Sequence, residues 1–348
     1  MKSKVAFKRV RGQSAATVQQ AVKAAMDIVR WKEDINGRSF FLKVNLLSRE
    51  VVPGQCTSPW VFEAVLREVR RQFPRAEISF GDCDVATSRQ VEAAVRNWGF
   101  LEIGSQYDAT FVNLSQSPVR RVQVGPIFGT LDIPAVLLEA EAMITIPVVK
   151  THCITPFTGA LKNQWGLLPR ARFKFHPVVH EAIAEVNYFF RDSMVLGVAD
   201  MTVAMEGPGP RVGFPRVCDL VMASRDLVAL DTLAAQYMGF EPDEVAFLLH
   251  AERRGLGTME VEILGDQFAR DPFQRGQGKD YLIYRWRDRF AATPLFKEFL
   301  SKEWFFRPLG WAATLYNRYF WYRKAGRKQA RHICQTTGYG EQFAGLIG

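Results

Sequence analysis

Four polar residues suited to chemistry lie close together in the segment 146–169, IPVVKTHCITPFTGALKNQWGLLP. They are two lysines, Lys150 and Lys162, a histidine, His152, and an amide, Asn163. Ammonium groups bind anions, and histidine exchanges protons near neutral pH. The segment therefore predicts either an anion-binding site with an acid or base, or a solvated loop whose charges have no chemical role.

Two carboxylates flank a predicted turn in the segment 195–215, VLGVADMTVAMEGPGPRVGFP. Asp200 ends an apolar run, and Glu206 precedes the sequence GPGP, which favours a rigid turn. The spacing does not fit the GxGxxG dinucleotide fingerprint, and proline lacks the N–H group that would hold a phosphate. We interpret the segment either as a structural turn or as a binding loop in which Asp200 and Glu206 act as acid or base.

A third polar group interrupts the apolar run FLKVNLL with Lys43 and Asn45. Alternation along a strand places both side chains on one face, so a sheet covered on both faces would bury a lysine. A buried ammonium needs a partner of opposite charge. Asp82 or Asp84, one predicted strand away, supplies the carboxylate that this prediction requires.

A hydroxyl residue precedes the next predicted helix, because Thr57 and Ser58 stand directly before Pro59. Proline is favoured at the first helical position, and serine or threonine is favoured at the N-cap. The hydroxyl therefore predicts a helix cap, and a hydroxyl at this position can also help to bind an anion at the helix N-terminus.

These polar residues follow or interrupt short apolar runs that predict buried strands, and amphipathic patterns between the runs predict helices. Such alternation indicates an α/β fold with a mostly parallel or mixed sheet and helices on both faces. Ligands of such sheets bind outside the carboxyl ends of the strands. The predicted strands are 39–47, 76–82, 108–115, 142–150, 193–201 and 219–224, and the predicted helices are 59–73, 88–99, 176–190, 225–238 and 242–255.

In order along residues 40–257, the chain resembles the domain of unknown function 362 family of bacteria and archaea. The similar stretches are KVNLL, TSPWVFEAV, FGDCD, VVKTHCITPFTGALKNQWGLLP, HPVVHEAIAE, VADMTVAMEGPGPRVG and ASRDLVALDTLAAQYMG. The resemblance implies candidate site residues without assigning their roles: Lys43, Asn45, Asp82, Lys150, His152, Lys162, Asn163, Asp200, Glu206, Gly207 and Asp231.

The resemblance also implies two differences. The family's opening motif has a proline where this chain has Val44, which changes the rigidity expected of that turn. Many relatives carry a ferredoxin-like module with cysteines for two iron–sulfur clusters, and this chain has none. Redox chemistry would therefore need a separate ferredoxin or flavin partner. A weaker similarity of motif style links the family to nickel-dependent lactate racemases, which also place lysines and histidines around an anionic substrate.

Composition limits the location and the cofactors that we expect. The five cysteines are scattered through the 348 residues without a CxxC spacing, so we predict neither a disulfide framework nor a metal site. No apolar stretch approaches the length of a transmembrane helix, and the basic start has no apolar region behind it. We therefore expect a cytoplasmic protein. The sequence names no cofactor.

The net charge of +9 resides in the C-terminal segment, because residues 279–332 contain thirteen Lys/Arg and four Asp/Glu. Composition turns aromatic and basic near residue 275, which predicts an α/β domain at 1–275 and a helical extension at 276–348. The aromatic residues at 304–322 either pack on the main domain or a second copy in a homodimer, or bind an anionic membrane surface or protein partner through 300–332. Without a recognised motif, we predict no nucleic-acid binding.

The leading functional prediction is an enzyme that acts on a small anion bearing a carboxylate or phosphate. Lys150 and Lys162 would hold the anion, His152 would act as acid or base, and Thr57 would contribute to substrate binding. The alternatives are a redox protein that works with the separate ferredoxin or flavin partner, and a non-enzymatic scaffold that docks at a membrane or a partner through its tail.

Overall fold

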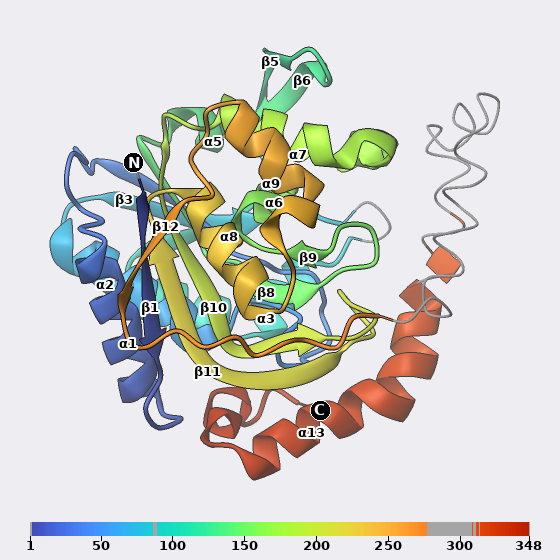
Figure 1. Ribbon diagram of the computed structural model, residues 1–348. Helices are drawn as coiled ribbons and strands as arrows, with labels where there is room; N and C mark the ends of the chain where they lie inside the picture. The colour runs from blue at the N-terminus through green and yellow to red at the C-terminus, as the bar shows by residue number, and fades with distance from the viewer. Residues whose placement is uncertain (1, 86–88, 277–307, 309–310, 313, 348) are drawn as a thin grey trace.

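The protein is described here from a computed structural model, which covers residues 2–85, 89–276, 308, 311–312 and 314–347 (Figure 1). Its main sheet runs in the order β12-β1-β11-β10-β7-β2-β3-β4, and the short strands β8 and β9 extend it beside β10. The bounds are β1 Ser3–Arg9, β2 Ser39–Lys43, β3 Glu77–Asp82, β4 Ala109–Asn113, β7 Ala142–Thr145, β8 Val148–Thr151, β9 Phe157–Thr158, β10 Met194–Glu206, β11 Phe214–Ser224 and β12 Val261–Gly265.

The sheet is mostly parallel, as predicted. The neighbours β10, β7, β2, β3 and β4 run in one direction, and β11 is antiparallel to both β1 and β10. The central strands are buried on both faces because they consist almost entirely of apolar residues, such as Phe40, Phe41 and Leu42 in β2. A separate hairpin, β5 Val119–Gly125 with β6 Gly129–Pro134, stands apart from this sheet (Figure 1).

The run 142–150, which was predicted to form one strand, forms two strands in the structure. It divides at Pro147, because proline has no N–H group to donate to a ladder. β7 ends at Thr145, the Ile146 N–H donates to Lys43 O at 2.8 Å, and β8 starts at Val148 beside β10. This offset carries Lys150 beyond the end of β7 and over the loop that follows β2.

Helices cover both faces of the sheet and enclose two cores. One core packs under α6, α7, α8 and α9, and the other under α1 to α4. The bounds are α1 Ala15–Ile28, α2 Pro59–Gln72, α3 Val91–Asn97, α4 Phe100–Gln106, α5 Ala135–Glu139, α6 Ala160–Asn163, α7 Val179–Phe189, α8 Leu227–Tyr237 and α9 Ala246–Arg253, with 3₁₀ turns η1 Gln164–Leu167, η2 Arg170–Val178 and η3 Pro242–Glu244.

Ser58 is the residue that caps α2. Its hydroxyl accepts the Val61 N–H at 3.2 Å, and Pro59 occupies the first helical position as predicted. Thr57 instead lies buried, where it accepts the Asn45 N–H at 2.9 Å and donates to Ile146 O at 2.6 Å. The Thr57 hydroxyl therefore joins the loop after β2 to the segment between β7 and β8.

The C-terminal region is helical, and its last turns pack into the second core. A π-helix, η4 Tyr316–Gly326, leads into α13 Arg327–Thr336 and the 3₁₀ turn η5 Gly338–Phe343. Tyr339 packs near Trp60, and Phe343 meets Trp98 edge-on with ring centroids 5.8 Å apart. The predicted aromatic residues at 304–306 lie outside the described residues. In the part of the chain that is described, no helix is long and apolar enough to cross a bilayer.

Candidate functional site

A buried ion pair stands at the carboxyl ends of β2 and β3. The Lys43 ammonium lies 2.8 Å from Asp82 Oδ1, and both side chains are buried. Asp82 also accepts the N–H groups of Leu46 at 2.8 Å and Cys83 at 2.7 Å. Burial lowers the pKa of Lys43, and the neighbouring carboxylate opposes this shift. Asp82 is therefore the carboxylate partner that a buried Lys43 was predicted to need.

A second buried ammonium, that of Lys150, has only neutral hydrogen-bond partners among the described residues. It donates to Asn45 Oδ1 at 2.7 Å and to the backbone oxygen of Gln55. Burial lowers the pKa of Lys150 to about 7, and the nearby positive charges of Lys162 and Lys43 act in the same direction. Lys150 therefore changes protonation state close to neutral pH.

Lys162 and Arg172 add two further cations to the group formed by Lys43 and Lys150. Among the residues described, Lys162 makes no hydrogen bond and no ion pair with a carboxylate, and burial lowers its pKa to about 8. The buried Arg172 guanidinium donates to Leu168 O at 3.0 Å, to Asp84 O at 2.9 Å and to the Cys83 thiol. Arg172 lowers the pKa values of both Lys162 and Lys43, so these cations form one electrostatic cluster.

Asn163 links Lys43, at the end of β2, to Lys150, in β8, through hydrogen bonds. Its Oδ1 accepts from Asn45 Nδ2 at 2.9 Å and from the Lys43 ammonium at 3.4 Å, and its Nδ2 donates to Lys43 O and to Thr145 Oγ1 at 3.0 Å. Asn45 in turn accepts from Lys150. A continuous chain of hydrogen bonds therefore runs from Asp82 to Lys150.

Asp231 holds the short helix that carries Lys162 and Asn163. Its carboxylate accepts the N–H groups of Ala160 at 2.6 Å and Leu161 at 2.9 Å, the first two residues of α6. Burial raises the pKa of Asp231 to about 7. Asp231 is therefore a positioning residue, which acts on the cluster through α6.

Asp200 lies in the middle of β10 and is buried. Its carboxylate accepts the Ser58 N–H at 2.7 Å and both the N–H and the hydroxyl of Thr202. Burial raises the pKa of Asp200, and the charge of Lys150 opposes this shift. Asp200 thus holds the N-terminus of α2 beside the lysine cluster.

Gly166 permits the close approach of η1 to the ion pair. A Cβ at this position would lie 2.4 Å from Asp82 Oδ1 and 2.8 Å from the Lys43 ammonium. No side chain fits there without displacing one of the two charged groups. The Lys43–Asp82 pair is therefore covered by backbone.

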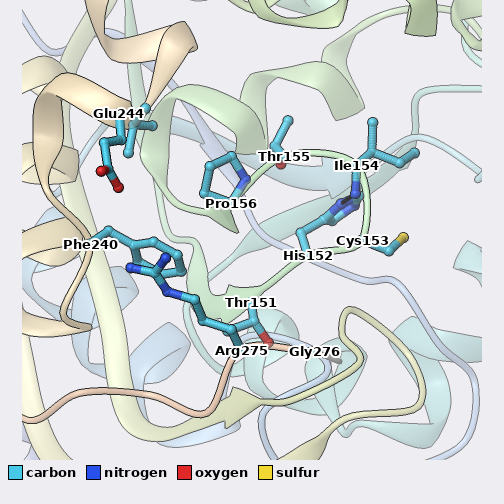
Figure 2. A pocket seen from close by; sticks show the side chains of 11 residues that line it. Thr151, His152, Cys153, Ile154, Thr155, Pro156, Phe240, Glu244, Arg275 and Gly276 are labelled. Carbon is cyan, nitrogen blue, oxygen red and sulfur yellow. Dashed lines mark hydrogen bonds between the residues drawn. The ribbon is translucent and has the colours of Figure 1, made fainter. Parts of the chain in front are cut away.

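His152 lies in the turn between β8 and β9, where it lines a pocket of about 400 Å³ (Figure 2). Its Nδ1 accepts the Ile154 N–H at 3.0 Å, which places the proton of the neutral ring on Nε2. Glu244 lines another side of the pocket, and the Arg275 guanidinium lies over the Phe240 ring at 4.4 Å.

The pocket adjoins the lysine cluster on one side. Cys153, the residue after His152, lines the pocket and is close enough to Lys162 to influence its pKa. A ligand in the pocket would therefore meet His152 and Arg275 and would lie next to the positive cluster.

Two predicted residues lie apart from the lysine network. Glu206, at the end of β10, forms an ion pair with Arg216 at 2.6 Å and accepts the Gln274 N–H at 2.9 Å. The Gly207 carbonyl accepts from the Thr151 hydroxyl at 2.8 Å, so it supports the strand that carries Lys150. The structure therefore gathers Lys43, Asn45, Thr57, Asp82, Lys150, Lys162, Asn163 and Asp200, places His152 in the adjoining pocket, and leaves Glu206 in a separate ion pair.

Sequence reasoning missed Arg172, Gly166 and Gln55. Arg172 lies in the run RARFKF, where nothing distinguishes it from a surface cation. Gln55 contributes only its backbone oxygen, which every residue has. Nothing in the sequence around Gly166 indicates that the backbone there packs against the Lys43–Asp82 pair. Only the fold could reveal these contacts.

A model of the family described as domain of unknown function (DUF362) matches residues 41–236, more than half of the chain. The match spans all the residues gathered at the site. The chain belongs to the DUF362 family.

Two individual proteins are similar to this DUF362 member. The thylakoid-associated protein sll1697 of Synechocystis is 27% identical over 238 residues, which cover 65% of this chain and 71% of that protein. The lactate racemase apoprotein from Thermoanaerobacterium thermosaccharolyticum matches in structure with a TM-score of 0.40 and 11% identity. That match covers 66% of this chain, and the chain spans 56% of the racemase's length.

Proposed function

We propose that this DUF362 protein is an enzyme that binds a small anion, with a carboxylate or phosphate group, at the carboxyl ends of β2, β3 and β8. The observation that carries the proposal is an excess of positive charge on buried and half-buried side chains. Of Lys43, Lys150, Lys162 and Arg172, only Lys43 has a carboxylate ion-pair partner among the described residues. A buried ammonium without a counter-charge is costly, so it either loses its proton or binds an anion.

The proposed anion would be held by the ammonium groups of Lys150 and Lys162, next to the pocket that His152 lines. Lys150 approaches from β8 and Lys162 from α6, and each lysine sits near enough to Arg172 or Lys43 to feel its charge. Carboxylates and phosphates make strong charge-assisted hydrogen bonds with such groups. A bound anion would also raise the pKa values of both lysines and keep them protonated.

Within this proposal, His152 exchanges the proton of the reaction. It lies in the pocket beside the cluster, and a histidine side chain exchanges protons near neutral pH as acid or base. The pKa of Lys150 is about 7 without a ligand, and the bound anion would raise it, so Lys150 would hold the substrate as a cation. The chemistry that fits these groups is acid–base catalysis on an anion that carries a carbonyl group.

Anion binding can be tested by thermal unfolding with inorganic phosphate and with small carboxylates such as oxalate. An anion at about 100 times its Kd stabilises the folded state by about 2.7 kcal/mol. Lys150→Met and Lys162→Met should abolish this stabilisation, whereas Lys4→Met, at an exposed position on β1, should retain it. Equal stabilisation of the wild type and both site variants would place the anion elsewhere.

The role of His152 can be tested separately by NMR. Carbonyl-bearing carboxylates such as 2-oxo acids, incubated with the protein in deuterium oxide, should take up deuterium next to the carbonyl. His152→Gln should lose this exchange and keep anion binding. Exchange at the same rate in the variant would remove His152 from the reaction.

We also propose a cytoplasmic location at the face of a membrane. All five cysteines are free thiols, which suits a reducing compartment, and the relative from Synechocystis is named as a thylakoid-associated protein. Fractionation of cells that express the protein should recover part of it with membranes and release it with high salt. Recovery only in the soluble fraction would contradict this location.

A further inference from the structure

The π-helix η4 and the residues before it expose large aromatic side chains. Trp311 is 69% exposed, Tyr316 58%, Tyr319 42% and Phe320 56%. The rings of Tyr316 and Phe320 stack on each other with centroids 6.2 Å apart, one turn apart on the helix. Exposed aromatic residues gathered in this way mark an interaction surface, because single exposed apolar residues are otherwise scattered.

Basic residues surround these rings, and acidic residues are absent from the sequence around them. Arg318 and Arg323 both approach the Tyr319 ring, at 5.4 Å and 5.1 Å, and Lys324 is exposed beside them. From 304 to 340 the sequence contains seven Lys/Arg and no Asp/Glu. We call Trp311, Tyr316, Arg318, Tyr319, Phe320, Arg323 and Lys324 the aromatic–basic face.

The opposite side of the same helix is fixed to the main domain. Trp321 and Tyr322 pack with Val52, Met205 and Ala330 in a small third core. Figure 1 shows the helix, in red, along the outside of the body. The aromatic–basic face is therefore presented outward by a helix that is anchored on its inner side.

We infer that the aromatic–basic face docks the protein on an anionic lipid bilayer. Charge complementarity favours lipid headgroups, because the face carries only positive charge. The amphipathic rings of tryptophan and tyrosine favour the boundary between headgroups and acyl chains. Cations placed beside these rings would meet the anionic headgroups at the same depth. The aromatic–basic face would be the surface through which the protein reaches the proposed membrane location. This face shares no residue with the anion site, so membrane docking does not depend on anion binding.

The test is sedimentation of the full-length protein with vesicles of phosphatidylcholine alone, and of phosphatidylcholine with about equal phosphatidylglycerol. We expect binding to the anionic vesicles, with weak binding to the neutral ones. Arg323→Gln/Lys324→Gln should weaken the affinity about 25-fold, about fivefold for each charge near the surface. The matched control is Lys2→Gln/Lys4→Gln, which removes two exposed cations of the main domain and should leave the affinity unchanged.

A second variant tests the aromatic part of the face. Tyr316→Ser/Phe320→Ser should reduce the affinity at least tenfold, and this loss should persist at high salt, where the electrostatic part is screened. Phe214→Ser, at a position 47% exposed on β11, is its control. Equal binding to neutral vesicles, unchanged affinity in both tail variants, or no binding by the wild type would overturn the inference. So would a homodimer, detected by native mass spectrometry, that the aromatic variant abolishes without any vesicle binding.

Discussion

Asp82→Asn should destabilise the protein strongly, because it removes the only carboxylate among the described residues that forms an ion pair with Lys43. The Lys43 ammonium would keep Val44 O at 2.6 Å and Asn163 Oδ1 at 3.4 Å, both neutral. Breaking a buried pair in this way costs about 3–5 kcal/mol. An upper limit follows from proton loss, since deprotonating a lysine of pKa about 10.4 at pH 7 costs about 4.6 kcal/mol.

The cost of Asp82→Asn in folding free energy depends on pH. Burial holds the pKa of Lys43 below its value in the unfolded chain, so the native state binds fewer protons and stability rises with pH. Without the carboxylate this effect grows. At about pH 9 the proton-loss limit falls to about 1.9 kcal/mol, and about 1 kcal/mol remains from the acceptor that Leu46 or Cys83 loses. The variant should therefore recover stability relative to the wild type as pH rises.

The assay is urea unfolding of the wild type, Asp82→Asn, Lys43→Met and the double variant at both pH values. The double variant should cost less than Asp82→Asn alone, because no charge is left without a partner. Asp27→Asn, in the exposed pair with Lys23, is the control and should change stability by about 0.5 kcal/mol or less. A cost below about 1 kcal/mol near neutral pH, or the same cost at both pH values, would refute the reasoning.

Three further changes test other parts of the account by urea unfolding. Asp231→Asn should destabilise by about 1–3 kcal/mol and weaken anion binding, because an amide can accept only one of the two N–H groups of α6; unchanged stability would contradict this role. Gly166→Ala should cost about 1–3 kcal/mol, because the new Cβ would lie 2.4 Å from Asp82 Oδ1, and a neutral outcome would mean that η1 shifts freely. Phe343→Ala should cost about 3–5 kcal/mol, whereas Phe320→Ala at an exposed position should change little; equal effects would contradict the docking of the C-terminus.

Much of the fold can be predicted from hydrophobic pattern alone. The buried strands of a parallel sheet are continuous apolar runs, so β2, β3, β4 and β7 stand out in the sequence. The direction of β11 cannot be predicted in this way, because its run DLVMAS marks a strand and says nothing of its neighbours. The strand β1 is missed because lysines and arginines interrupt its apolar residues.

The candidate site is predicted in part for a similar reason. Lys43 is recognisable because a charged residue within an apolar run must find a partner, and Asp82 is the partner at the end of the adjacent strand. Arg172 is not recognisable, since its burial depends on how η2 packs on the loop after β3. The pairing of Glu206 with Arg216 is equally hidden, because it depends on the register of β10 against β11.

The most direct measurement of the central claim is isothermal titration of the wild type and Lys150→Met with phosphate and oxalate over a pH series, in buffers of different ionisation enthalpy. The pKa values of Lys150, about 7, and of Lys162, about 8, predict that anion binding takes up protons above neutral pH. Affinity should fall as pH rises through this range, and Lys150→Met should lose most of the binding. No binding of either anion, or binding without proton uptake that Lys150→Met retains, would contradict the claim.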